Sequence, residues 1–147
     1  MPGSGVSYCS PGSQVKWPTS RISPEDLFSR AQDAFSNAYA PYSGFKVGAA
    51  ILTSKDEIIS GCNVENAVLS LTVCAERNAM TTLIQTGGGQ PLAIAVACAN
   101  GRECLPCGSC RQFLMEFNPR MLVVAGSKGN LLIHVLSDLL PRPFLLE

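Results

Sequence analysis

The sequence predicts an α/β fold with three layers, α-β-α, in which helices cover both faces of a central mixed sheet of about five strands. Helix-like and strand-like segments alternate along the chain, and residues 92–99 form an apolar run typical of a strand that is buried on both faces. The chain has 147 residues, 46% of them hydrophobic and 15% charged, so its length suits one well-buried domain.

The first predicted elements are a helix and a hairpin. Ser23 is a suitable N-cap, and a proline and two acidic residues follow it in the first turn. Apolar residues then repeat at helical spacing to about Tyr39, and Pro41 ends the helix. Residues 45–53 and 57–63 are predicted to pair as an antiparallel hairpin.

The rest of the chain continues the alternation of helices and strands. Three consecutive glycines at 87–89 are expected to end the second helix. The predicted elements are helices over 73–86 and 108–117, strands over 92–99, 121–125 and 131–134, and a last helical turn over 137–140.

Residues 1–22 are predicted to be a disordered tail, and residues 23–147 the folded domain. The segment is rich in glycine, serine and proline. It contains no acidic residue and carries Lys16 and Arg21, a composition that also fits a transit peptide. We favour the tail.

Charge and cysteine content narrow the function classes. Eleven basic and eleven acidic residues give a net charge of zero, so nothing indicates a nucleic-acid or anionic-membrane partner. No apolar stretch approaches the roughly 20 residues of a membrane span, and the N-terminus lacks the pattern of a secretory signal. Seven cysteines are an odd number, which favours metal ligation or buried thiols over disulfides and predicts a reducing, cytoplasmic location.

Three cysteines and one glutamate indicate a catalytic zinc site. Cys74 and Glu76 lie two residues apart, and Cys107 and Cys110 follow about thirty residues later. Three thiolates leave the fourth tetrahedral position of Zn²⁺ free for water, and a carboxylate beside that position can move protons. This layout is a signature of zinc deaminases that act on cytosine or adenine.

Both cysteine groups are predicted at helix starts, where backbone N–H groups and the helix dipole stabilise thiolates. Three thiolates weaken zinc as a Lewis acid, so another positive group has to offset their charge. Arg77 follows Glu76 directly and is our candidate for this charge-tuning role. The alternative is an exposed arginine in a surface ion pair.

Other interpretations of the cysteines stay open at this point. Cys104 could complete a closed four-cysteine site, although Glu76 would then have no task. Cys107 and Cys110 alone also fit a thioredoxin-type redox pair. Cys98 lies in an apolar strand and is interpreted as a packed small side chain. His134, the only histidine, is interpreted as structural.

From about Pro24 to Phe144 the chain resembles the small, single-domain, zinc-dependent cytidine deaminases. Six sequence blocks in the right order carry the resemblance: APYS at 40–43, FKVGAA at 45–50, GCNVENA at 61–67, CAER at 74–77, PCGSCRQ at 106–112 and LLP at 139–141. The resemblance implies hydrolysis of free cytidine and 2′-deoxycytidine to uridine and 2′-deoxyuridine with release of ammonia, a step of pyrimidine salvage.

The resemblance also implies a role for each site residue. Cys74, Cys107 and Cys110 would hold one zinc ion per subunit. Glu76 would take a proton from the zinc-bound water, deliver it to the ring nitrogen and help the amino group leave after attack at C4.

The substrate-binding residues follow from the same resemblance. Phe45 would stack on the pyrimidine, Asn63 and Glu65 would bind the ribose hydroxyls, and the backbone of Ala75 would contact the base. Asn63 and Glu65 are two residues apart at a predicted strand end, so their side chains face the same way. From the residues alone, Phe45 could equally be an ordinary core residue.

The resemblance implies a homotetramer whose pockets are completed by neighbouring subunits. One residue departs from the family pattern: Leu69 stands where many members carry an aromatic residue. Phe144 is expected at a subunit contact, and the alternative is that it folds back onto its own subunit. The competing functions are deamination of another aminopyrimidine nucleoside, such as a nucleoside antibiotic, an RNA- or DNA-editing deaminase, and a zinc-stabilised module without catalysis.

Overall fold

The computed structural model describes residues 5–10 and 15–147, which form one six-stranded mixed sheet with helices on both faces. The strands are β1 (Val6–Tyr8), β2 (Val47–Thr53), β3 (Ile58–Cys62), β4 (Pro91–Cys98), β5 (Leu122–Ser127) and β6 (Asn130–Val135), in the spatial order β1-β6-β5-β4-β2-β3. The pairs β1–β6 and β4–β5 are parallel and the other three are antiparallel. The predicted fold class is confirmed, with six strands instead of about five.

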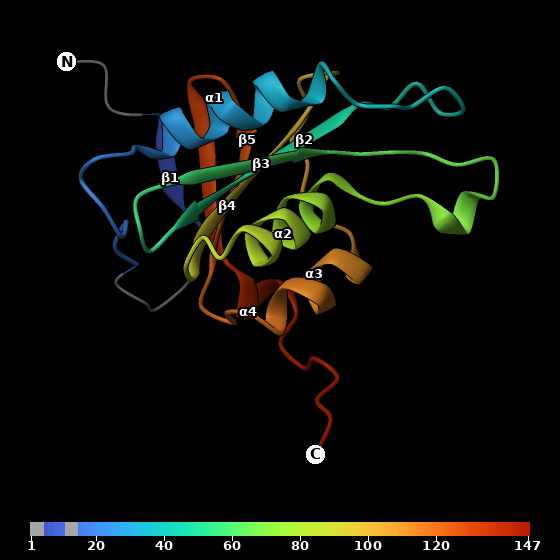
Figure 1. Ribbon diagram of the computed structural model, residues 1–147. Coiled ribbons are helices and arrows are strands. Elements are labelled where there is room, and N and C mark those ends of the chain that lie inside the picture. The colour runs from blue at the N-terminus through green and yellow to red at the C-terminus, as the bar shows by residue number, and fades with distance from the viewer. Residues whose placement is uncertain (1–4, 11–14) are drawn as a thin grey trace.

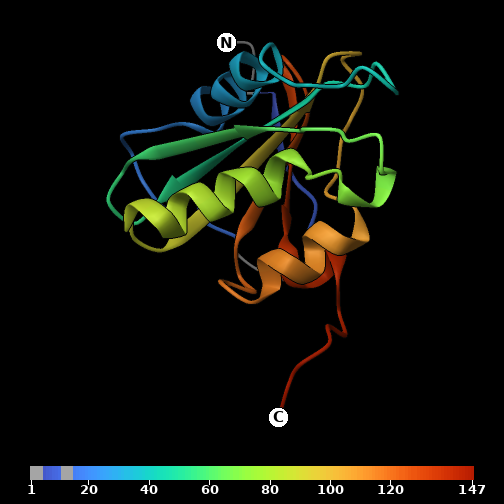
Figure 2. The same cartoon turned by 45° about the vertical axis from the view of Figure 1, so that its right-hand side comes forward.

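Helices form the two outer layers. They are α1 (Pro24–Phe35), α2 (Ala75–Thr86), α3 (Gly108–Met115) and α4 (Leu136–Leu139), together with a 3₁₀ turn at Leu69–Leu71. Helix α1 covers one face of the sheet, and α2, α3 and α4 lie on the other (Figures 1 and 2). Strand β4 shows why the core forms: Ala93 and Ala95 pack toward α1, and Ile94 and Val96 pack toward α2 and α3. Its apolar run is therefore buried on both faces, as predicted.

Helix α1 begins as predicted but ends four residues earlier than expected. Ser23 and Asp26 form a capping box, in which each backbone N–H donates to the other residue's side-chain oxygen at 3.0 Å. The helix stops at Phe35 because Tyr39 forms a bridge with the segment after β3: its N–H donates to Asn63 O, and its carbonyl accepts from Glu65 N. The early end of α1 thus aligns Tyr39 with two candidate site residues.

Helix α2 lies unusually close to β3. A Cβ on Gly61 would come within 2.5 Å of the backbone nitrogen of Ala79, so only glycine allows this approach. At the other end of α2, Gly87 adopts the left-handed conformation (φ 65°) and caps the helix, as the glycine run predicted. The close packing fixes the first turn of α2, which carries Ala75 and Glu76, against the sheet.

The prediction of a disordered tail over 1–22 is wrong for the residues that the structure describes; residues 1–4 and 11–14 lie outside them. Strand β1 pairs with β6, Cys9 N donates to Ile133 O at 2.8 Å, and Val135 N donates to Ser10 Oγ at 3.0 Å. Trp17 packs on the α1 side of the core and donates from Nε1 to the carbonyl of Ile22 at 2.6 Å. Main-chain pairing with the free edge of β6 orders a segment that has no sequence periodicity.

Among the described residues, no helix combines the length and the apolar character that crossing a membrane requires.

The docking of the N-terminal segment predicts a measurable contribution to stability. Trp17→Ala removes a half-buried aromatic ring and one hydrogen bond, so we expect the free energy of unfolding to fall by about 1–3 kcal/mol. Lys16→Ala, at the exposed neighbouring position, should stay within about 0.5 kcal/mol of the parent protein. Urea unfolding followed by circular dichroism measures both; equal stability of the two variants would contradict the docking.

Candidate functional site

Three cysteines meet where two helices begin. Cys74 is the N-cap of α2, Cys107 is the N-cap of α3, and Cys110 lies in the first turn of α3. Their Sγ atoms all lie within 4.8 Å of one another. A zinc ion with Zn–S distances of about 2.3 Å places tetrahedral sulfur ligands about 3.8 Å apart, so the cluster fits the ion and leaves one position for a non-protein ligand.

The local electrostatics favour a thiolate in this cluster. The pKa of Cys74 is lowered to about 5, mainly because the thiol of Cys110 donates a hydrogen bond to it and also because Arg77 lies nearby. The pKa of Cys110 is raised, because its proton is held in that hydrogen bond and because the thiol is buried. A cation that replaces these protons would find the sulfur atoms already gathered.

Arg77 lies beside the cluster and not in a surface ion pair. Its Nη2 donates to the carbonyl of Thr72 at 2.9 Å and lies 4.0 Å from Cys74 Sγ. Its Nε is buried without a hydrogen-bond partner among the described residues. The guanidinium is therefore placed where its charge acts on the Cys74 sulfur.

Glu76 is buried next to the cysteines. Its side chain belongs to the first turn of α2, and the residue is 5% exposed. Burial raises the pKa of the carboxyl to about 7, and the negative charge of Cys74 acts in the same direction. A carboxyl in this state can both accept and donate a proton near neutral pH.

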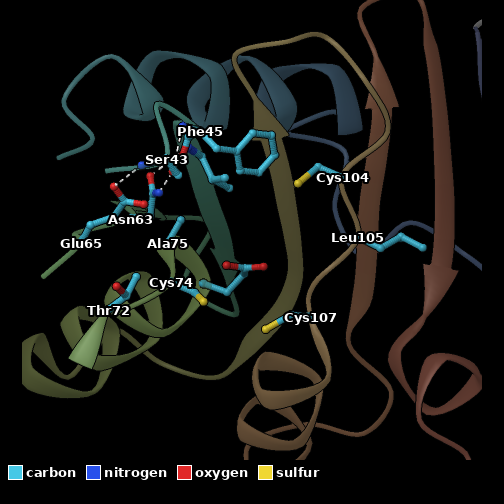
Figure 3. A pocket seen from close by; sticks show the side chains of 12 residues that line it. Ser43, Phe45, Asn63, Glu65, Thr72, Cys74, Ala75, Cys104, Leu105 and Cys107 are labelled. Atoms are coloured by element: carbon cyan, nitrogen blue, oxygen red, sulfur yellow. Dashed lines mark hydrogen bonds between the residues drawn. The ribbon is translucent and has the colours of Figure 1, made fainter. Parts of the chain in front are cut away.

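A pocket of about 270 Å³ opens over Glu76 and the cysteine cluster. It brings together most of the residues that the sequence nominated: Phe45, Asn63, Glu65, Cys74, Ala75, Glu76 and Cys107. Figure 3 shows Asn63 and Glu65 on one side of it, with Cys104 and Leu105 across from them. Cys110 belongs to the cluster but does not line the pocket, and Arg77 lies beside Cys74, also outside the lining.

Asn63 and Glu65 shape the pocket through hydrogen bonds to the segment before β2. Asn63 Oδ1 accepts from Val47 N at 2.9 Å, and its Nδ2 donates to Phe45 O at 2.8 Å. Glu65 Oε1 accepts from the backbone N–H groups of Tyr42 and Ser43 at 3.0 and 3.1 Å. Hydrogen bonds from Ser43 lower the pKa of Glu65, so this carboxylate is charged. The position of Phe45 in the pocket depends on this network.

Sequence reasoning missed five residues of the lining, namely Ser43, Val47, Thr72, Cys104 and Leu105. Ser43 and Val47 belong to the quoted blocks around Phe45, which was a usable signal. Cys104 and Leu105 directly precede the PCGSC block, and their position next to Cys107 could have suggested them. We find no sequence signal for Thr72.

The remaining cysteines and the histidine are placed outside the cluster. Among the described residues, Cys104 is not part of the cluster formed by Cys74, Cys107 and Cys110. Burial raises the pKa of the Cys104 thiol to about 12. Cys98 is buried in β4, as interpreted from the sequence. His134 lies on β6, and its Nε2 is 3.7 Å from Glu103 Oε1. The geometry favours the open three-cysteine site over a closed four-cysteine site.

Two candidate contact residues are exposed. Leu69 begins the 3₁₀ turn and is 68% exposed, and Phe144 is 73% exposed. The backbone of Phe144 is held by Gln112, whose Oε1 accepts from Phe144 N and whose Nε2 donates to Phe144 O, both at 2.9 Å. The ring is nevertheless left in solvent, so it does not fold back onto its own subunit.

The fold, the three-thiol cluster and the buried carboxylate define a zinc-dependent deaminase class of enzyme. Residues 22–126 match the family model described as the cytidine and deoxycytidylate deaminase zinc-binding region. The chain therefore belongs to the cytidine deaminase family, and it is a zinc enzyme of that family.

Comparisons with individual proteins agree. The chain is 41% identical over 121 residues to a cytidine deaminase of Mycobacterium tuberculosis, covering 82% of this chain and 89% of the relative. It is 39% identical over 123 residues to a cytidine deaminase of Halalkalibacterium halodurans, covering 82% and 93%. The crystal structure of a cytidine deaminase from Burkholderia pseudomallei superposes with a TM-score of 0.78 at 39% identity, covering 84% of this chain and 100% of that one.

The geometry of the cluster predicts which cysteines retain zinc. Cys74→Ala, Cys107→Ala and Cys110→Ala should each lose most of the bound metal, because each removes one of three convergent sulfur ligands. Cys104→Ala should keep about one zinc ion per chain, since its neutral thiol stands apart from the cluster. Metal analysis of the purified proteins measures this. Loss of zinc from Cys104→Ala would support the closed site instead.

Proposed function

We propose that this protein hydrolyses free cytidine and 2′-deoxycytidine to uridine and 2′-deoxyuridine and releases ammonia. The observation that carries the proposal is the meeting of Glu76 and the cysteine cluster at a pocket that also contains Phe45, Asn63 and Glu65. The relatives of this chain are named cytidine deaminases. No comparison favours deamination of another nucleoside or a zinc module without catalysis.

The charges of the pocket support a nucleoside as the substrate and argue against a nucleotide. Among the described residues that line it, Glu65 and Glu76 carry ionisable carboxyl groups, and none is a lysine or an arginine. A phosphate would meet like charge here and no basic partner. The same absence argues against a nucleic-acid strand as substrate.

The pocket residues divide into two groups around a nucleoside. Phe45 offers an aromatic face for the pyrimidine, and the backbone of Ala75 lies beside the base. Asn63 and Glu65 supply polar atoms for the ribose hydroxyls; Glu65 can also accept hydrogen bonds through Oε2. A substrate held in this way directs its exocyclic amino group toward Glu76 and the cluster.

Cys74, Cys107 and Cys110 hold the zinc ion, which when bound polarises the water that is added to the ring. Glu76 accepts a proton from the added water and delivers it to the ring nitrogen. It then takes the proton of the new C4 hydroxyl and donates it to the amino group as the C4–N bond breaks, which leaves a C4 carbonyl and ammonia. Its burial keeps it from solvent, so the protons pass between the carboxyl and the substrate. Arg77 offsets the negative charge of the thiolates from its position beside Cys74.

We further propose that the protein works in the cytoplasm in pyrimidine salvage. All seven cysteines are free, which agrees with a reducing compartment.

Glu76→Gln tests the proton-transfer role. The substitution keeps size and hydrogen bonding but cannot carry a proton, so kcat should fall by about 10²–10⁴ or more. Loss of cytidine is followed by ultraviolet absorbance together with ammonia release, and zinc content should equal that of the parent protein. More than about a tenth of the parent activity in Glu76→Gln would remove this residue from the mechanism. A zinc-loaded parent protein that fails to deaminate cytidine would refute the function itself.

The exposed apolar residues support a homotetramer whose subunits complete one another's pockets. Leu69 and Phe144 leave large apolar side chains in solvent in the single chain, and Phe45 in the pocket is 41% exposed. Closed point-group assemblies are the usual way for soluble subunits to cover such surface. We propose that Leu69 takes the place of the usual aromatic in this contact by apolar packing alone.

This assembly is testable by light scattering at micromolar concentration, which should give about four times the mass of the 147-residue chain. Phe144→Ala should weaken the assembly, and activity per chain should fall with it because the pockets are proposed to be completed by neighbouring subunits. A fully active monomer would contradict the shared pocket. A Phe144→Ala protein that stays tetrameric and fully active would limit the error to that residue.

A further inference from the structure

Residues 99–105 connect β4 to α3, and we call them the pocket loop. Cys104 and Leu105, at its end, line the pocket on the side opposite Asn63 and Glu65 (Figure 3) and pack against the core beneath α2 and α3. The chain then reaches Cys107 two residues later. The loop therefore supplies one wall of the pocket, and its position decides how closely that wall meets a bound molecule.

The two halves of the pocket loop are held differently. In the first half, Asn100 Oδ1 accepts from the Cys98 thiol at 2.9 Å and from Arg102 N at 3.0 Å, and Gly101 N donates to Cys98 O at 3.1 Å. Within the part of the chain that the structure describes, residues 103–105 make no backbone hydrogen bond. The wall residues thus lie in the half with fewer local constraints.

A contact from β6 reaches this second half. Ile133 and Val135 pack toward α1, so the alternation of the strand points His134 to the other face of the sheet, where the pocket lies. His134 Nε2 is buried, has no hydrogen-bond partner among the described residues, and lies 3.7 Å from Glu103 Oε1. Glu103 is the residue directly before Cys104. A buried nitrogen without a partner favours closer approach of this carboxylate, to which an Nε2–H can donate.

We propose that Glu103 and His134 are positioning residues for the substrate pocket: their contact holds the pocket loop against β6 and fixes the wall formed by Cys104 and Leu105. Neither residue lines the pocket, so both act through that wall. The inference rests on the proposed function for the identity of the bound nucleoside. It assigns to the only histidine of the chain a role in substrate binding, in place of a purely structural one.

The placement of the reacting groups predicts which kinetic constant changes. Ala75 and Glu76 belong to α2 and Cys74 is its N-cap, so none of the three is part of the pocket loop. If the Glu103–His134 contact is lost, a bound nucleoside has to order a looser wall, which weakens binding. Once the pocket is filled, the chemistry proceeds as before. The expected signature is a higher KM with little change in kcat.

Steady-state kinetics on cytidine with the full-length, zinc-loaded protein test this. Glu103→Ala and His134→Leu should each raise KM by about threefold to tenfold with kcat within about twofold, and the double variant should match the larger single effect. His134→Gln keeps a donor and should retain a KM within about twofold of the parent. Arg102→Ala, at the exposed neighbouring position, is the matched control and should change neither constant.

A second readout does not depend on turnover. Labelling of Cys104 by a maleimide, followed by peptide mass spectrometry, should be faster in Glu103→Ala than in Arg102→Ala, because the freed wall exposes the thiol more often. This comparison stands even if the parent protein proves inactive on cytidine, which would refute the proposed function alone. Glu103 is exposed, so Glu103→Ala is expected to fold. The Glu103→Ala variant therefore tests the contact even if His134→Leu does not fold.

Three results would overturn the proposal. The first is an unchanged KM and an unchanged labelling rate in Glu103→Ala. The second is strictly additive effects of the two substitutions, which would show that the side chains act separately. The third is a loss of zinc or a fall in kcat at constant KM, which would mean that the contact supports the metal ligand Cys107 and not the pocket wall.

Discussion

The structure depends on the convergence of two helix N-termini on one face of the sheet. Cys74 and Cys107 stand at these N-termini, and both helices begin on the same side of the molecule (Figure 2). Helix dipoles and free N–H groups favour negative sulfur there, yet three thiolates without a cation repel one another. The close approach of α2 to Gly61 and the burial of both helices in one hydrophobic cluster with β4 impose the convergence. The metal site is therefore a product of sheet packing, and zinc relieves the repulsion that this packing creates.

The pocket above the cluster is built by the same polar groups that are proposed to bind the substrate. Asn63 holds the backbone on both sides of Lys46, and Glu65 holds the turn at Tyr42 and Ser43. Their hydrogen bonds fix Phe45 before any ligand arrives, which lowers the ordering cost of binding. The cost is that part of their hydrogen-bonding capacity is already used: the Asn63 amide keeps one N–H, and Glu65 keeps Oε2. Ribose hydroxyls have to be recognised with what remains.

Much of the fold and of the metal centre could be predicted from the sequence because their signals are local. The capping box at Ser23, the apolar run of β4 and the cysteine spacing each depend on neighbours in the chain. Strand β1 could not be predicted, because three residues flanked by glycine, serine and proline carry no periodicity and are ordered by the distant edge of β6. Helix α1 was predicted too long for a similar reason: its end is set by Tyr39 pairing with residues beyond β3. The far wall of the pocket was missed because its residues come from a loop.

The buried polar residues show which side chains are present for folding and which are present for function. Thr53, Asn63 and Glu76 are the buried polar or charged residues among those described, and two of the three line the pocket. Thr53 has a local explanation, because its Oγ1 accepts hydrogen bonds in the β2–β3 turn. Glu76 has none: its carboxyl is buried beside a thiolate, which opposes ionisation, and an apolar residue would suit the core better. A buried carboxyl next to the cluster lowers the stability of the fold, and it gives the proposed reaction a group that can exchange protons with the substrate. The proposed reaction therefore depends on Glu76.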